Sequence, residues 1–444
     1  MLRSQLMVNV ASGAVTTGIN IVVLAVAYPV YLHFLGYELY GVWLILGTVL
    51  AFAQMGNLQI GPAVTKFVAE EYGREDIGGV ARYVLMAMVM LSATGILVLV
   101  LILAFNTQII AVFKLDSDHA EIASRLLPYV GILCIYAFVV HALNATLSGL
   151  GRLDLANYTH SAGRVVAVIV ASALLCTGLR VESLLVANIV SYMVVHAAST
   201  FFIRRAAPVR FLRRENWDPP RLKKLLHFGS GVFGGSLMGL LLSPFHKLML
   251  SRCAGVATVP VYDLAYNGSM QFRSLAEAGL RALMPEISRV GANLTKKARD
   301  SINQIHQRAL KYVIVFGAPA YLALFTLAVP LLKIWLRDRY VDTLPGSFRV
   351  LLVATFLSLI GVPAYYTLMG LGRVRHTFVS HVLQSLISVA VVLAVALSAA
   401  LTVEGVAWAV FVGVAASTAY LLCQKRRLFQ HERYGDDDHE TIGR

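Results

Sequence analysis

Charged side chains interrupt residues 261–283, a segment that is otherwise apolar enough to cross a membrane. Arg273, Glu277 and Arg281 follow one another at a spacing of four residues, so on a helix they lie along one face. A charge inside a membrane costs about 2.5–3.5 kcal/mol on insertion scales, and such groups usually face a wet cavity. The segment therefore has two interpretations: a cavity lining that binds a polar substrate, or a ladder of ion pairs that neutralises itself.

The composition makes a membrane the solvent of this chain. Hydrophobic residues make up 58% and charged residues only 14% of the sequence, and the mean hydropathy is +0.70. A soluble domain could not bury so much apolar surface, which indicates a multi-pass membrane protein. The net charge of +14 is explained by basic cytoplasmic loops, so we expect no nucleic-acid partner.

Charge-free runs of about 20 residues predict an all-α protein with about twelve transmembrane helices. The expected segments are residues 7–35, 39–65, 83–105, 126–148, 157–176, 184–203, 226–250, 261–283, 312–334, 350–369, 377–397 and 406–423. Lys and Arg concentrate at both termini and in the even-numbered loops, which predicts that both termini are cytoplasmic.

The second half of the chain repeats the first. Thr146-Leu-Ser-Gly-Leu-Gly-Arg152 returns 221 positions later as Thr367-Leu-Met-Gly-Leu-Gly-Arg373. A fixed offset between related motifs indicates duplication. We expect two homologous six-helix lobes around a central cavity, related by an axis along the membrane normal. The expected domains are an N-lobe (1–203), a basic cytoplasmic linker (204–225), a C-lobe (226–424) and a cytoplasmic tail (425–444).

Polar stripes occur on the first two helices of each expected lobe and are the candidates for contact with a substrate. The expected cavity residues are Asn20 on the first segment, Gln54, Asn57 and Lys66 on or just after the second, Arg164 on the fifth, Lys247 on the seventh, and Asn267, Gln271, Arg273, Glu277 and Arg281 on the eighth. Small residues on the seventh segment favour close helix packing instead.

The chain carries no motif for a cofactor or a metal. Its four cysteines are far apart, which argues against a disulfide framework or a CxxC site. The Gly-Leu-Gly-Arg motifs lack the Walker lysine and the GxGxxG spacing, so no nucleotide loop is expected. We expect neither a cofactor nor an enzymatic activity, and any transport would not use ATP.

Four motifs together resemble the polysaccharide-biosynthesis branch of the multidrug/oligosaccharidyl-lipid/polysaccharide flippase superfamily. They are residues 36–43 after the first helix, 61–70 closing the second, 148–154 after the fourth and 262–266 opening the eighth. Their order, the helix number and the twofold repeat match together over nearly the whole chain. Asn57 departs from this pattern, because family members often carry an acid there. A carboxylate-based cation site at that position is therefore in doubt.

The resemblance implies a flippase that moves an undecaprenyl-pyrophosphate-linked oligosaccharide from the cytoplasmic to the outer leaflet of a bacterial inner membrane. Such flippases serve O-antigen (lipopolysaccharide) and exopolysaccharide synthesis, and the implied mechanism is alternating access by rocking of two lobes. A diphosphate head needs cationic partners, for which Lys66, Arg164, Lys247 and Arg273 are the candidates. We expect a monomer whose partners are this substrate and membrane lipids; coupling to H⁺ or Na⁺ is compatible but not required.

Two other functions fit parts of the pattern. A cation-coupled multidrug exporter of the same fold would favour acids in the first lobe, but helices one to six hold none within their apolar cores. A membrane polymerase or glycosyltransferase would need a large external loop or a catalytic domain. The longest expected external loop, residues 106–125, is too short for one.

Overall fold

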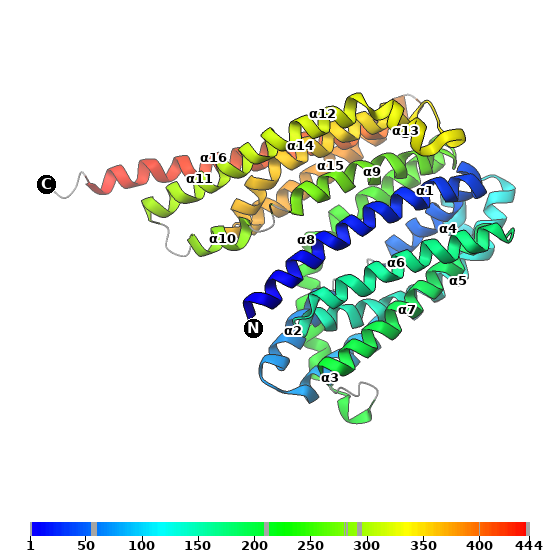
Figure 1. The fold of residues 1–444 in the computed structure, drawn as a ribbon, viewed down its shortest axis with the longest axis horizontal. Coiled ribbons are helices and arrows are strands. Elements are labelled where there is room, and N and C mark those ends of the chain that lie inside the picture. The colour runs from blue at the N-terminus through cyan, green and yellow to red at the C-terminus, as the bar shows by residue number, and fades with distance from the viewer. Residues whose placement is uncertain are drawn as a thin grey trace. The chain divides into compact units, whose positions relative to one another are not determined.

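The computed structural model describes residues 2–54, 60–207, 213–278, 280, 283–290, 295–398 and 400–440 (Figure 1). Every regular element in these ranges is a helix, which confirms the all-α class predicted from the sequence. The chain forms two compact units, Met1–Pro260 and Val261–Arg444. We call them unit 1 and unit 2.

Unit 1 consists mainly of long helices joined by short turns. They are α1 (Leu2–Gln54), α2 (Ile60–Gly73), α3 (Ile77–Ala104), α4 (Asn106–Val112), α5 (Ser117–Gly149), α6 (Leu153–Cys176), α7 (Glu182–Ala206), the 3₁₀ turn η2 (Arg214–Asn216) and α8 (Pro219–Ala254). Its best-packed core is apolar and lies where α2, α3 and α5 meet, around fully buried side chains such as Met86 and Phe138.

Unit 2 begins within α9 (Thr258–Ala278), whose first residues precede the boundary. It continues through α10 (Leu283–Val290), α11 (Lys296–Tyr312), the π-helical turn η3 (Val313–Gly317), α12 (Ala318–Thr326), α13 (Ala328–Leu336), η4 (Arg337–Arg339), α14 (Leu344–Gly370), α15 (Val374–Ser398) and α16 (Val403–Glu440). Helix α16 packs along both α14 and α15 (Figure 1).

Nine helices in the described part of the chain are long and apolar enough to cross a membrane. These nine account for ten of the twelve expected segments, because α1 contains the first two. The other two expected segments correspond to α8 and α9. Helix α9 is not among the nine membrane-crossing candidates because its polar face lowers its mean hydropathy, as its sequence already indicated. The chain is a multi-pass membrane protein, while the side of the membrane on which its termini lie stays a prediction.

The first two expected segments are two helical stretches of α1 that meet at a kink, which lies at Gly36. Gly36 has φ 68° and ψ −176°, a conformation that residues with a Cβ rarely adopt. The chain therefore turns there without a loop. The second segment was expected to span residues 39–65; α1 is described to Gln54 and α2 from Ile60, and residues 55–59 lie outside the described part of the chain.

The repeated Gly-Leu-Gly-Arg motif forms the same turn in both units. Gly151 and Gly372 have φ 77° and 73°. The amide of Arg152 donates to the Leu147 carbonyl at 3.0 Å, and the amide of Arg373 donates to the Leu368 carbonyl at 2.8 Å. This bond from the residue after the glycine to a carbonyl five positions earlier is a Schellman cap. The motif ends a helix and turns the chain tightly into the next one, as its glycines predicted.

The border between the two units differs from the expected domain border. Arg221, in the expected linker, donates to the Gly79 carbonyl at 3.0 Å and lies 3.6 Å from a Glu71 carboxylate oxygen. Its guanidinium also lies 4.8 Å from the centre of the Tyr83 ring. These contacts attach the start of α8 to α2 and α3, so the compact unit extends to residue 260. The lobe boundaries drawn from the repeat stay a prediction.

Candidate functional site

Arg273 and Glu277 form an ion pair on α9, with Arg273 Nη2 3.2 Å from Glu277 Oε2. Their side chains are 22% and 18% exposed. The spacing of four residues thus produces the intrahelical pair that the sequence offered as one interpretation. Arg281, the third member of the expected ladder, lies outside the described residues.

The same two side chains also line a polar cavity of about 270 Å³ inside unit 2. Four helices contribute to it: Arg273 and Glu277 from α9; Ser358, Gly361, Val362, Tyr365, Tyr366 and Met369 from α14; Ser380, His381 and Gln384 from α15; and Val414, Ser417, Thr418 and Leu421 from α16. Pairing and cavity lining are therefore not alternatives, because Arg273 and Glu277 do both.

Hydrogen bonding fixes the carboxylate of this cavity more completely than its guanidinium. Tyr366 Oη donates to Glu277 Oε1 at 3.0 Å, so each carboxylate oxygen has a partner. Arg273 Nε is buried and makes no hydrogen bond with the described residues. On the other wall, the Tyr365 and His381 rings meet edge to face with centres 5.7 Å apart. The cavity thus offers a spare guanidinium donor beside aromatic faces.

The cavity can bind a polar or anionic group better than it can bind a cation. The Glu277 carboxylate is already paired with Arg273 and accepts a hydrogen bond from Tyr366, whereas Ser380, Gln384 and Arg273 Nε offer hydrogen-bonding groups. Among the described residues, no three His, Cys, Asp or Glu side chains gather in a way that could hold a metal.

Sequence analysis missed the cavity residues of α14, α15 and α16. The search for polar stripes stopped at the first two helices of each lobe. The signal was present, because Ser380 and Gln384 are four residues apart with His381 beside them, inside the expected segment 377–397. The aromatic pair Tyr365 and Tyr366 gave no comparable signal, since aromatic residues are common in apolar helices.

Polar residues at the start of α1 have a different role, because they bond to α6 within unit 1. Asn9 Nδ2 donates to the Gly151 carbonyl at 3.1 Å and Asn9 Oδ1 accepts from the Asp154 amide at 3.1 Å; Asn157 Nδ2 donates to Ser12 Oγ at 2.9 Å, and Ser161 Oγ donates to Thr16 Oγ1 at 3.1 Å. We call this set the α1–α6 polar seam. In the last three of these four bonds the two partners are 145 residues apart in the sequence. A constant separation means that α1 and α6 lie side by side and run in the same direction.

Asn20 and Arg164 stand one turn beyond the last bond of this seam. Asn20 Oδ1 is buried and has no hydrogen-bond partner among the described residues. Arg164, on α6, is exposed and forms no ion pair with a described carboxylate. The seam therefore ends at a buried amide oxygen without a partner on α1 and an exposed arginine on α6.

The other expected cavity residues are scattered. Lys66 lies on the surface of α2, with its ammonium 3.8 Å from Glu70 and 5.1 Å from the centre of the Phe67 ring. Lys247 is half-buried on α8, and Asn267 and Gln271 are half-buried on α9. Gln54 is the last residue of α1, and Asn57 lies outside the described residues. The structure brings together only Arg273 and Glu277 in the cavity lining, and the substrate-binding role of the whole set stays a prediction.

Carboxylates of unit 1 sit near the helix ends. Asp154 and Glu182 open α6 and α7, where they pair with Arg152 at 3.0 Å and Arg125 at 2.5 Å. Hydrogen bonding to Asp154 raises the pKa of Arg152, which lies in the turn before α6. Asp116 precedes α5, and a hydrogen bond from His119 lowers the pKa of its carboxyl group. These three carboxylates thus lie at the ends of their helices.

Part of the chain matches a known protein family. Residues 41–173 match the MatE family. A comparison with curated proteins gives no match. The matched region runs from the second half of α1 to α6, so it contains the repeated turn of unit 1 and most of α6.

Solved structures of transporters match almost the whole chain. An inward-facing multidrug resistance MATE family transporter of the MOP superfamily gives a TM-score of 0.72 at 14% identity, covering 96% of this chain and 99% of that one. The fold is that of a MOP-superfamily transporter. The lipid II flippase MurJ in an inward closed conformation also gives 0.72 at 14% identity, covering 93% and 87%. A MOP-superfamily transporter from Pyrococcus furiosus, described by the reverse polarity of its binding pocket, gives 0.67 at 14%, covering 96% and 95%.

This result confirms the superfamily fold and its two lobes, which the sequence motifs predicted. Matches at this identity to both multidrug transporters and a lipid flippase do not separate the branches of the MOP superfamily. Membership of the polysaccharide-biosynthesis branch therefore stays a prediction, and the choice between substrates depends on the chemistry of the sites.

Proposed function

We propose that the protein is a flippase for a lipid-linked oligosaccharide of the undecaprenyl-pyrophosphate type. It would move this lipid from the cytoplasmic to the outer leaflet of a bacterial inner membrane, by alternating access, for the synthesis of cell-surface polysaccharide. The MOP-superfamily fold supports a transporter rather than an enzyme. The substrate class is argued below from the charges inside the helices.

Arg164 is the observation that carries this proposal. It lies well inside the α6 span and forms no ion pair with a described carboxylate. An unpaired charge inside a membrane segment costs about 2.5–3.5 kcal/mol, so it is retained where a ligand or water compensates it. A pyrophosphate group supplies the missing counter-charge, whereas a cationic drug would be repelled.

The cavity of unit 2 supports the same substrate class. Its only carboxylate among the described lining residues, Glu277, already has two partners, so little negative charge is left to attract a cation. Its tyrosines, serines and Gln384 suit the hydroxyl groups and apolar faces of a sugar. An inside-negative membrane potential favours outward movement of the anion by about 2.3 kcal/mol per charge at 100 mV.

Transport can be measured with purified protein in liposomes. The substrate is an undecaprenyl-pyrophosphate oligosaccharide with a fluorescent sugar, and its transfer to the outer leaflet is followed by an impermeant quencher. We expect the wild-type protein to accelerate transfer and Arg164→Gln to slow it about tenfold or more, because a charge-assisted contact is lost. The matched control is Arg180→Gln, an exposed arginine in the turn after α6, which should leave the rate unchanged.

Two results would contradict the proposal. Transfer no faster than in protein-free liposomes would exclude the lipid-linked substrate. Equal slowing in the Arg164 and Arg180 variants would show a general effect of positive charge rather than a contact inside α6.

Imposing a pH or Na⁺ gradient across the same liposomes tests the predicted but optional coupling to H⁺ or Na⁺.

A multidrug exporter is the second candidate, favoured by the MatE match and by the match to a transporter described by multidrug resistance. The same liposomes can be tested with a cationic dye such as ethidium in place of the lipid. Dye movement without lipid movement would favour the exporter. The unpaired Arg164 and the neutralised Glu277 predict the opposite outcome.

A further inference from the structure

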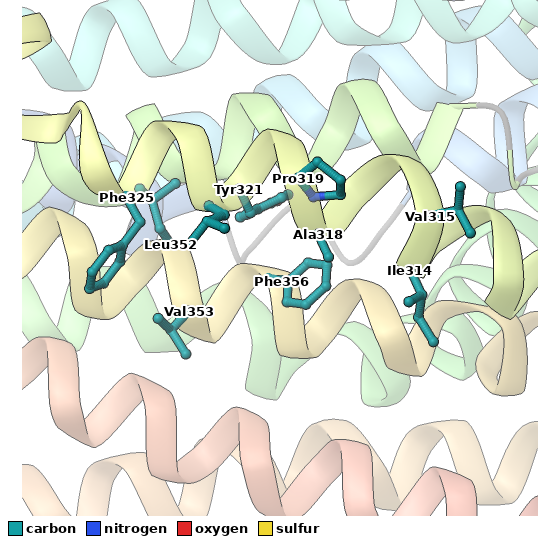
Figure 2. Close-up of a pocket in the computed structure, with 10 residues that line it drawn as sticks. Ile314, Val315, Ala318, Pro319, Tyr321, Phe325, Leu352, Val353 and Phe356 are labelled. Carbon is teal, nitrogen blue, oxygen red and sulfur yellow. The ribbon is translucent and has the colours of Figure 1, made fainter.

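An apolar groove of about 700 Å³ runs along the surface of unit 2 between η3–α12 and α14 (Figure 2). Its lining is Ile314, Val315, Ala318, Pro319, Tyr321, Leu322, Phe325, Leu352, Val353 and Phe356. Leu322 is 64% and Ile314 is 49% exposed, so apolar side chains border open space at both ends of the groove. The polar cavity described above uses a different part of α14.

The local sequence explains why the two helices leave this space. A π-helical turn, Val313–Gly317, separates α11 from α12, and such a turn shifts the side chains that follow it. The small Ala318 comes next. Tyr321 and Phe356 then meet across the groove with ring centres 5.1 Å apart, and form its floor (Figure 2).

A guanidinium closes one end of the groove. Arg349 Nε donates to the Phe325 carbonyl at 3.0 Å, and its Cζ lies 5.3 Å from the centre of the Phe325 ring. Arg349 precedes Leu352, Val353 and Phe356 at helical spacing, so it lies on the face of α14 that lines the groove. It sits in the second turn of α14, near the end of the span.

Most of the binding capacity of Arg349 is unused. A guanidinium has five N–H donors, and the structure occupies one of them. Arg349 makes no ion pair with the described carboxylates. The remaining donors suit the oxygens of a phosphate group, which arginine binds in a bidentate manner.

We propose that this groove binds one acyl chain of an anionic phospholipid, whose phosphate contacts Arg349. From Ile314 to Phe325 the helix rises about 17 Å at 1.5 Å per residue, roughly half of a 30 Å hydrocarbon core. The groove therefore has the length of one leaflet. A chain along it would place its head group at the level where Arg349 stands.

A second copy of the chain fits this face less well. A twofold dimer contact would pair the same surface on both copies. It would bring two Arg349 side chains toward one interface, where like charges repel. An anionic lipid instead supplies the opposite charge at that end and an apolar chain for the rest. The site is independent of the flippase proposal, since neither of its components lies in the polar cavity of unit 2.

The test uses the purified full-length protein in a neutral detergent. Native mass spectrometry measures the binding of phosphatidylglycerol and of phosphatidylcholine with identical chains. We expect phosphatidylglycerol to bind about tenfold more tightly at one site, because the choline ammonium of phosphatidylcholine already balances the phosphate charge that Arg349 would otherwise attract. Arg349→Gln should remove this preference and leave the weak binding of both lipids. The matched control, Arg337→Gln, changes an exposed arginine of the adjacent turn η4 and should keep the preference.

A second variant tests the groove itself. Ala318→Leu fills the space between α12 and α14, and we expect it to weaken both lipids while the melting temperature without added lipid stays unchanged. If this variant does not fold, Ala318→Val is used in its place. Equal binding of the two lipids by the wild-type protein overturns the proposal, as does tighter binding of undecaprenyl phosphate, or a dimer that Ala318→Leu abolishes.

Discussion

The α1–α6 polar seam of unit 1 and the polar cavity of unit 2 use stripes of the same kind on membrane helices. In the seam, Asn9, Ser12 and Thr16 of α1 bond to α6 or to the turn before it, and the four bonds measure 2.9–3.1 Å. In the cavity, side chains from α9, α14, α15 and α16 surround about 270 Å³ of space. One stripe holds two helices together, and the other keeps four helices apart.

Side-chain size separates the two outcomes. The seam consists of Asn, Ser and Thr, whose short side chains let helix backbones approach closely enough to bond directly. The cavity lining adds Arg, Glu, Tyr, His and Gln to its short Ser and Thr side chains, and these longer side chains do not fit between helices in contact. Polarity on a helix face thus shows that a stripe is not facing lipid, while the length of its side chains indicates whether it packs or lines a space.

Removing the guanidinium of the cavity should give the largest effect. Arg273→Leu leaves the Glu277 carboxylate, which is 18% exposed, with the Tyr366 hydroxyl as its remaining partner among the described residues. We expect loss of lipid transfer in the liposome assay. We also expect a fall of about 1–3 kcal/mol in the free energy of unfolding, because a largely buried charge loses its partner. Denaturant unfolding measures the second quantity.

The double variant Arg273→Leu/Glu277→Leu separates these two effects. Because no charge is left unpaired, it should regain most of the lost stability, while transfer stays lost. Transfer by this double variant at the wild-type rate would show that the pair is only a structural ladder. The cavity would then resemble the seam in function as well as in composition.

The hydroxyl of Tyr366 should matter less than the guanidinium. Tyr366→Phe removes the 3.0 Å bond to Glu277 but keeps the ion pair with Arg273. We expect a loss of about 1 kcal/mol of stability and a reduction of transfer of a few-fold. Tyr365→Phe is the matched control, since its hydroxyl makes no hydrogen bond with a described residue, and it should leave stability unchanged. An equal loss in both variants would mean that cavity shape, not this bond, sets the effect.

The sequence predicted the features that depend on local spacing. The repeated Gly-Leu-Gly-Arg motif implied a tight turn, and Gly151 and Gly372 form the same cap in the two units. Arg273 and Glu277, four residues apart, implied a pair and formed one at 3.2 Å. Long apolar runs implied membrane helices. Each of these features involves residues that are neighbours along one helix or turn, so spacing alone determines it.

The sequence did not predict the features that depend on how helices face one another. Asn9 and Ser12 were read only as a polar stripe, because their partners on α6 lie about 145 residues away. His381 joins Arg273 in one cavity lining through the packing of α14 to α16.

Breaking one bond of the seam should give the smallest effect. In a double-mutant cycle of Ser12→Ala and Asn157→Ala, we expect a coupling energy of about 0.6 kcal/mol, the average for hydrogen bonds between membrane helices. Transfer should stay at the wild-type rate, because the bond joins α1 to α6 and leaves no open space.

The control is a cycle of Thr17→Ala and Asn157→Ala, since Thr17 donates within its own helix to the Gly13 carbonyl at 2.9 Å and should show no coupling. A loss of transfer with unchanged stability in the Ser12 or Asn157 variant would place the seam in the substrate path. Side-chain length would then no longer separate a packing stripe from a lining stripe in this protein.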